Sequence, residues 1–427
     1  MIFFFSNKAM KHQPYTRLII IIASLIGGSL YAQQLTYSDF INQVTLSNHD
    51  YLAAQHQCSE IEALSHAARK IANPAISAGY DNNSDRTMLM GQSASLEISQ
   101  TISFGRAARL RNAGHVAQAA QASLQHYRST LLADATQAYL QALLQRDLVA
   151  ISTETIHNLT TLYQADSLRY ASGDLSQIDL MQSRIELGVA LQEHTNLEAS
   201  YRQALLQLDQ LMGNPSRGTT QLQGQLTLPQ QHFHPDSLMH WALRGRHDIA
   251  EAKHLSQAAQ SELTELRRER LPEIELSFGA NYNTRVRNEE APAPQFVGYS
   301  FALSMPLPVA NINRGDIIAG QHRVQQAQEQ QLSICDQAVI QVLSALNSYQ
   351  AAHDRALLFN NQFLQQALQV LEGRLYAYRR GESTLLEVVE AQRTYNDIRT
   401  AHAESLFQCQ SALIDLEYSS GIWDISF

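Results

Sequence analysis

The chain has few cysteines and, beyond its start, no long apolar run. Its 427 residues include only three cysteines, Cys58, Cys335 and Cys409, and none belongs to a C-x-x-C pair. This number and spacing predict neither a disulfide framework nor a thiolate metal site. Each cysteine is expected to be a small buried apolar residue, and a single bridge between two of them stays open. After residue 32 no run reaches the roughly 20 apolar residues of a membrane-spanning helix, so a bundle of such helices is not predicted.

The sequence also lacks the motifs of common enzyme and nucleotide-binding classes. It has no glycine-rich phosphate loop, no nucleophile elbow and no His-Glu-x-x-His pair. Histidines gather at residues 232–254, but His240, His247 and His254 follow one another at seven-residue intervals, and no carboxylate or cysteine joins them at ligand spacing. We therefore predict no catalytic residue, no metal site and no cofactor, and we keep an enzyme only as a third alternative.

The apolar stretch at residues 18–30 follows Lys8, Lys11 and Arg17 and precedes Ala32. A basic start, a short apolar core and a small final residue predict a secretory signal peptide over residues 1–32. A retained membrane anchor is the alternative, and Met10 is a second candidate start. Removal of the peptide changes the formal net charge from −9 to −12. An acidic exported chain is not expected to bind nucleic acid.

Two long tracts are almost free of proline and glycine, which predicts long helices. Residues 107–171 contain no proline and one glycine, Gly114, and a second tract runs from about residue 316 to 379. Each would measure roughly 95 Å as an unbroken helix. Shorter helices are predicted at about 36–71, 176–212, 236–270 and 384–418. Lengths so far above the ordinary mean of about 11–12 residues indicate a coiled-coil-like assembly.

Four short segments alternate apolar and polar residues with a period of two, which predicts strands with one apolar face. They lie at about 74–84, 92–103, 272–284 and 296–306. Residues 82–85 and 287–292 are polar and are expected to form loops within each strand pair. Such strands match those of outer-membrane barrels, and a soluble β-domain is the alternative.

A repeated segment shows that the chain is built twice. The residues from Tyr170 to Asp179 read YASGDLSQID, and 208 positions later those from Tyr378 to Glu387 read YRRGESTLLE. Each half is predicted to run helix, strand, strand, long helix, turn, helix. We divide the chain into a signal peptide (1–32), a first structural repeat (33–213), a linker (214–235), a second structural repeat (236–419) and a C-terminal tail (420–427).

Four strands are too few to close a membrane barrel, which needs at least about eight. An open sheet in lipid would leave backbone groups unpaired at a prohibitive cost. Several copies are therefore expected to share one barrel. Two copies would give eight strands and a plugged interior, whereas three would give twelve and room for a pore. Polar residues on the inner face, such as Ser95, Ser277 and Asn281, favour the pore.

Along essentially its whole length, the mature chain resembles the TolC-type outer-membrane efflux family. The repeated Tyr-x-x-Gly turns, the strand starts at Pro74 and Pro272, and the segment SMPLPVANINRG at 304–315 carry the resemblance, which is strongest to the CzcC and CusC cation-efflux branch. It implies a homotrimer with a 12-stranded outer-membrane β-barrel and a long periplasmic α-helical barrel. It also implies an inner-membrane pump, of the RND type in that branch, and a periplasmic adaptor as partners.

The resemblance also implies roles for the repeated turns. Glu387 and Glu390 match the acidic residues that ring the periplasmic constriction, and Tyr378 and Asp179 match residues that hold the tunnel end closed. Ser383 stands where some members have arginine, so an arginine-based closing link is in doubt. The turns are expected to be the periplasmic tips where an adaptor docks, formed by Tyr170, Gly173, Asp174, Ser176, Gly381, Glu382 and Thr384.

Simpler interpretations of these residues remain open. Glu387 and Asp179 stand three residues after Thr384 and Ser176, the spacing of a capping box, so both carboxylates have a local capping role as an alternative. Glu390 has the alternative of an ordinary solvated helix face. For the whole chain we predict a passive duct for cation efflux in the outer membrane and periplasm. Multidrug efflux and type I protein secretion are the alternatives within that class, and a periplasmic adaptor or scaffold without a pore is the alternative from a different class.

Overall fold

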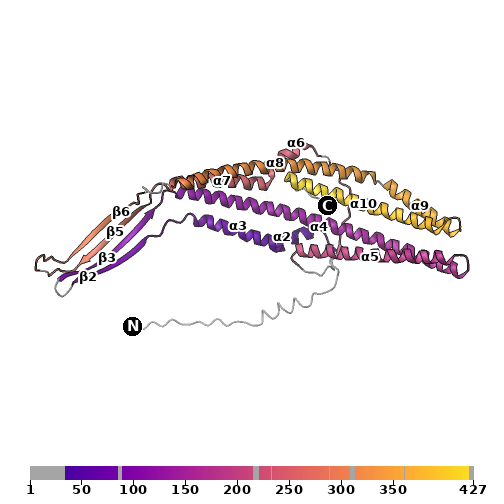
Figure 1. Ribbon diagram of the computed structural model, residues 1–427, viewed down its shortest axis with the longest axis horizontal. Helices are drawn as coiled ribbons and strands as arrows, with labels where there is room; N and C mark the ends of the chain where they lie inside the picture. Colours follow the sequence, from indigo (N-terminus) through magenta and orange to yellow (C-terminus); the bar gives the residue numbers. More distant parts are fainter. Residues whose placement is uncertain are drawn as a thin grey trace, which may run out of the picture.

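Long helices lie side by side in an elongated molecule, with a β-sheet at one end and two helical hairpin turns at the other (Figure 1). The structure is a computed structural model that describes residues 34–84, 89–214, 221–231, 233–287, 289–307, 313–359 and 361–422. The predicted signal peptide and the last five residues of the predicted tail lie outside the described residues. The predicted fold class, mainly helical with a small sheet, is confirmed.

The helices account for most of the described residues. They are α2 (Tyr37–Ser47), α3 (His49–Ala67), α4 (Arg106–Ala171), α5 (Gln177–Leu211), α6 (Pro235–Gly245), α7 (His247–Arg268), α8 (Arg314–Leu358), α9 (Asn361–Arg379) and α10 (Leu385–Ser420). The 66-residue α4 is one continuous helix and packs against α3, α5, α7 and α10. No helix among these described residues combines the length and apolar character needed to cross a bilayer.

Three tracts predicted as single helices are broken. The first breaks at Asn48, whose extended backbone and side-chain oxygen cap α3 by accepting from the Tyr51 N–H. The second breaks at Arg246, which also has extended backbone. The third ends as α8 at Leu358 and resumes as α9 at Asn361, where the sequence reads Phe-Asn-Asn. Asparagine side chains compete for backbone hydrogen bonds, which disfavours a helix interior.

The four-stranded sheet is antiparallel with the order β2-β3-β5-β6 (Figure 1). Its strands are β2 (Ala75–Ser84), β3 (Leu89–Ile102), β5 (Ile274–Asn283) and β6 (Phe296–Ser304). The register aligns Ile76, Ile98, Phe278 and Phe301 in one row across the sheet. All four side chains are exposed, so one apolar face has no cover within the chain. Residues 82–84, expected in a loop, continue strand β2.

The predicted linker also contributes to the fold. Within it, β4 (Gln221–Leu222) pairs in parallel with β1 (Gln34–Leu35). The Tyr139 hydroxyl donates to the carbonyl oxygens of Leu35 and Gln223, at 3.1 and 2.5 Å, and so fixes this small sheet on α4. A core of buried side chains surrounds it, including Phe40, Leu140 and Leu208. The start of the first repeat and the linker are therefore joined at the middle of α4.

Candidate functional site

The two hairpin turns have the same backbone. In the first, Gly173 has a φ of +84°, and the Asp174 N–H donates to the Arg169 carbonyl at 2.8 Å. In the second, Gly381 has a φ of +79°, and the Glu382 N–H donates to the Ala377 carbonyl at 2.9 Å. Both are helix ends of the Schellman type, in which glycine takes the left-handed conformation without a steric penalty.

The returning helices also begin alike. The Ser176 hydroxyl accepts from the Asp179 N–H at 3.1 Å, and the Thr384 hydroxyl accepts from the Glu387 N–H at 3.4 Å. Ser176 also donates to the Asp179 carboxylate at 2.7 Å. These contacts are the local capping arrangement that the spacing allows. A capping contact does not by itself prevent a carboxylate from acting on ions that pass the tip.

The corresponding tyrosines of the two turns differ in environment. Tyr170 is 43% exposed, whereas Tyr378 is 5% exposed. The Tyr378 hydroxyl donates to Asp166 Oδ1 at 2.7 Å, and the Ser183 hydroxyl donates to Asp166 Oδ2. The Arg169 guanidinium lies 5.1 Å from the centre of the Tyr378 ring. These contacts tie α9 to α4 and α5, and burial followed by the bond to Asp166 raises the pKa of Tyr378.

The residue bonded to Tyr378 was not among those that the sequence suggested. Of the two residues expected to hold the tunnel end closed, Tyr378 bonds within the chain to Asp166, which is fully buried, while Asp179 remains at its cap. Sequence reasoning missed Asp166. A signal was present, because Leu159, Leu162 and Asp166 follow the three-and-four spacing of a buried helix face.

Glu387 is held by two neighbours at the start of α10. Its carboxylate accepts from the Ser383 hydroxyl and from Arg374 Nη1, the latter at 3.0 Å. The Ser383 bond, followed by the Arg374 charge, lowers the pKa of this carboxyl below its ordinary value. Glu390 lies one turn further along α10 and is exposed. Ser383 is therefore one of the groups that fix Glu387.

Polar contacts continue between the two hairpins above the tips. Arg393 binds both oxygens of the Glu186 carboxylate, at 2.9 and 3.0 Å. Nearer the middle of the helices, the Thr155 hydroxyl donates to Asn396 Oδ1 at 3.1 Å. An apolar cluster of buried side chains extends from the tips toward these levels: Leu159, Leu162, Ala190, Tyr378, Leu385, Val388 and Val389. The second hairpin is thus fixed on the first mainly through α10 and α4.

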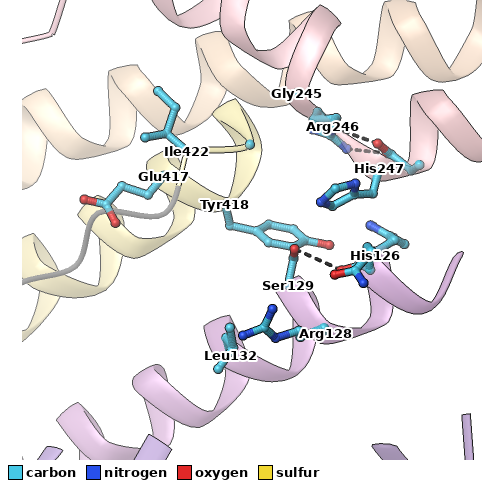
Figure 2. A pocket seen from close by; sticks show the side chains of 13 residues that line it. His126, Arg128, Ser129, Leu132, Gly245, Arg246, His247, Glu417, Tyr418 and Ile422 are labelled. Carbon is cyan, nitrogen blue, oxygen red and sulfur yellow. Dashed lines mark hydrogen bonds and ion pairs between the residues drawn. The ribbon is translucent and has the colours of Figure 1, made fainter. Parts of the chain in front are cut away.

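A separate cavity of about 230 Å³ lies where α4, the α6–α7 junction and the end of α10 meet (Figure 2). Arg246 crosses its wall, binds Asp248 at 3.1 and 2.7 Å, and donates to the Ser419 carbonyl at 3.0 Å. Burial alone would raise the pKa of Asp248, but the hydrogen bonds and charge of Arg246 lower it. His126 stacks on Tyr418 in the same wall. These mutual contacts are typical of a structural junction.

The histidines and cysteines are separated in the fold. His247 lines the cavity just described, and His254 stacks on His115 between α7 and α4. His232 lies outside the described residues. Cys58 and Cys409 are buried, Cys335 is half-buried, and all three are free. Within the described ranges, no group of three or more His, Cys, Asp or Glu side chains is arranged to hold a metal ion.

Long helices that continue into a sheet with an outward apolar face define the subunit of an outer-membrane channel. The sequence model of the family described as outer membrane efflux protein matches residues 40–214 and 238–421. The chain therefore belongs to this family. Its location is the outer membrane, with a large helical portion in the periplasm. The family resemblance noted in the sequence is confirmed.

Several characterised relatives and solved structures are similar over most of the chain. The cobalt-zinc-cadmium resistance protein CzcC of Cupriavidus metallidurans is 23% identical over 386 residues, which are 90% of each chain. The pyoverdine export protein OpmQ of Pseudomonas aeruginosa is 26% identical over 78% of this chain and 71% of its own. The structure of CusC has a TM-score of 0.74 at 19% identity, covering 90% of this chain and 92% of its own. VceC from Vibrio cholerae gives 0.73 at 18% identity, covering 90% and 95%.

Proposed function

We propose that this chain forms, as a homotrimer, the passive outer-membrane and periplasmic duct of a tripartite pump that exports heavy-metal cations. The observation that carries the proposal is the four-stranded sheet. Strands β2 and β6 each have a pairing partner on one side only within the described sheet. In lipid, unpaired strand edges are prohibitively costly, so each edge requires another copy. Three copies supply twelve strands, enough for a pore, and the polar row of Ser95, Asn281 and Gly298 faces away from the apolar side.

The tips support docking of a periplasmic adaptor, through which an inner-membrane pump of the RND type would supply energy. All seven residues assigned to docking are exposed at the end of the helical part: Tyr170, Gly173, Asp174, Ser176, Gly381, Glu382 and Thr384. The duct itself performs no chemistry. In a periplasmic adaptor or scaffold without a pore, the apolar face of the sheet would be exposed to water.

Closure of the duct at this end is assigned to Tyr378, Asp179, Glu387 and Glu390. The buried bond from Tyr378 to Asp166 holds the second hairpin on the first and so favours a closed position. In a trimer, Glu387 and Glu390 would form two rings of three carboxylates, which attract cations and repel one another. The first hairpin has Asp179 followed by Gln182, so the second acidic ring belongs to the second repeat alone.

Cargo is the finer part of the proposal. The likeness to CzcC extends over 90% of both chains and supports heavy-metal cations. The likeness to OpmQ, named for pyoverdine export, keeps export of larger molecules as the alternative cargo, whether drugs or secreted proteins.

A deletion strain tests the function. Loss of the gene is expected to lower tolerance to zinc, cobalt and cadmium, and the intact gene on a plasmid should restore it. Tolerance to dyes and antibiotics, measured in parallel, separates the alternative cargo. Fractionation tests the class, because a trimer that leaves the outer membrane only in detergent fits a duct. Release with soluble periplasmic proteins would instead show an adaptor.

A further inference from the structure

We propose that α9 of one copy packs against α5 of the next copy, with Phe363 seated over Gly188 of that neighbour. This inference rests on the proposed homotrimer and names the surfaces that meet in it. Neither surface is covered within the chain, because α9 packs on α10 and α5 packs chiefly on α4.

The contact between the two hairpins inside the chain provides the template. There α10 lies against α4, with Thr155 bonded to Asn396 and with Leu162 packed in one cluster with Val389. The internal repeat relates α4 to α9 and α5 to α10 by a shift of 208 positions. This shift holds without a gap between the tips and these contacts, because α5, α9 and α10 are each continuous there.

Applying the shift of 208 positions to the residues of the internal contact gives the residues expected in the contact between copies. Thr155 and Asn396 become Phe363 and Gly188, while Leu162 and Val389 become Val370 and Met181. Phe363, Val370 and Met181 are more than half exposed, at 54%, 57% and 57%. Burial of such side chains is a favourable driving force for association. The chain therefore carries two matching apolar faces that it cannot bring together by itself.

The two faces are complementary in shape as well as polarity. Glycine inside a helix costs about 1 kcal/mol relative to alanine, and a side chain at Gly188 would meet nothing within 4 Å in its own chain. The chain itself gives no packing reason for this glycine. The large Phe363 ring at the corresponding place on α9 supplies one, because a flat helix surface lets the ring lie close to the backbone.

The same shift replaces the charged pairs of the internal contact with other residues. Inside the chain, Arg393 binds Glu186, but the shifted positions hold Ile185 and Thr394. Nearer the tip, the pair of Tyr378 and Asp166 becomes Tyr170 and Arg374, so an arginine meets the exposed tyrosine where the internal contact has a carboxylate. The contact between copies is thus expected to be more apolar than the one within each copy.

A second copy is the occupant that fits. Each chain presents one α9 face and one α5 face, and contacts between two different faces form a ring that closes when the rotation allows. The twelve strands of the proposed barrel set that number at three. An adaptor seated on the α5 face is the competing occupant, and it would leave the complementary α9 face unexplained.

The first test uses bulk at Gly188. The Gly188→Leu chain should fold normally, because its side chain has open space, but the fraction of trimer recovered in detergent should fall about tenfold or more, as overpacking does. Adding Phe363→Ala should restore much of it, because the two sites are coupled. Glu193→Leu, an exposed position on the other side of α5, is the control and should leave the trimer unchanged. Equal trimer in Gly188→Leu and Glu193→Leu would refute the contact.

The second test uses cysteine pairs in a chain whose three native cysteines are replaced by alanine and whose trimer is checked first. Oxidation of isolated membranes should link copies through Phe363→Cys with Gly188→Cys, but not through Phe363→Cys with Glu193→Cys. If the first pair links no better than the second while the trimer forms, the contact is wrong and the proposed duct stands. Linkage only to an adaptor would also overturn it. Absence of any trimer from the unaltered chain would overturn the proposed function instead.

Discussion

Asn48 and Arg246 perform one task in the two halves of the chain by different chemistry. Asn48 breaks the first predicted helix and donates to the Leu211 carbonyl at 3.0 Å, at the end of α5. Arg246 breaks the second and donates to the Ser419 carbonyl, near the end of α10. Leu211 and Ser419 are themselves related by the repeat. The amide needs no counter-ion, whereas the buried guanidinium requires Asp248. Both halves therefore keep a side-chain contact to the carbonyl of a distant helix end, but an amide makes it in the first half and a guanidinium with its counter-ion makes it in the second.

The tips differ in the same manner. Their backbones coincide, yet Tyr378 is buried against Asp166, whereas Tyr170 stays exposed. Each tyrosine has the environment that the neighbouring hairpin provides. The second hairpin meets the first within the chain, and the first is free to meet another copy. The comparison teaches that the repeat fixes local geometry, and that the contacts around it decide stability and closure.

The largest expected difference concerns the helix breaks. Arg246→Ala should lower the free energy of unfolding by about 3–5 kcal/mol, because it leaves the half-buried Asp248 carboxylate without its partner. Asn48→Ala should lower it by only about 1 kcal/mol. Unfolding in guanidinium, followed by helical circular dichroism of the detergent-solubilised protein, measures both free energies.

The effect of Arg246→Ala should also depend on pH. Because the pKa of Asp248 is lowered, the ion pair contributes fully to the free energy of unfolding above the ordinary pKa of about 3.9, and this contribution is lost as the pH falls through the lower folded value. The difference between the Arg246→Ala protein and the unaltered protein should therefore shrink in acid. Equal losses for both substitutions would contradict the assigned roles.

The next difference concerns the tyrosines. Tyr378→Phe removes a hydrogen bond to a buried carboxylate and should cost about 2 kcal/mol, or roughly a thirtyfold faster opening of the tip. Tyr170→Phe should have almost no effect on the isolated chain. Hydrogen exchange of residues 159–166 and 383–389 reports this opening. A similar rate in both variants would show that the buried bond does not hold the hairpins together.

The carboxylates of the two tips should differ least in their effect on stability, but they should differ in their effect on transport. Glu387→Ala with Glu390→Ala should raise conductance in planar bilayers and weaken block by multivalent cations, because both acidic rings are removed. Asp179→Ala with Gln182→Ala, the corresponding pair of the first hairpin, should change both less. The Ser383 bond lowers the pKa of Glu387, so this carboxylate should be charged, and block by multivalent cations should persist, at neutral pH. Unchanged block in the first variant would exclude the acidic gate.

Much of the fold could be predicted because its signals are local. The period of two predicted strands with one apolar face, and the register brings those residues into common rows. Absence of proline and scarcity of glycine predicted a long helix where α4 lies. The breaks at Asn48 and Arg246 were missed, although His-Asp follows each of them in the sequence. Neither residue excludes a helix by itself, and the extended backbone there is stabilised by contacts to distant helix ends.

The sequence by itself determined the two turns. Glycine at the helix end and serine or threonine before the return need only neighbours a few residues away. Only the tertiary structure decided that Tyr378 is buried, that Asp166 accepts its hydrogen bond across 212 positions, and that Arg374 of α9 binds Glu387 of α10. Periodicity marks Asp166 as a residue on a buried face, but it cannot say which hairpin covers that face. That choice depends on how long helices pack side by side, and packing joins residues that the sequence keeps far apart.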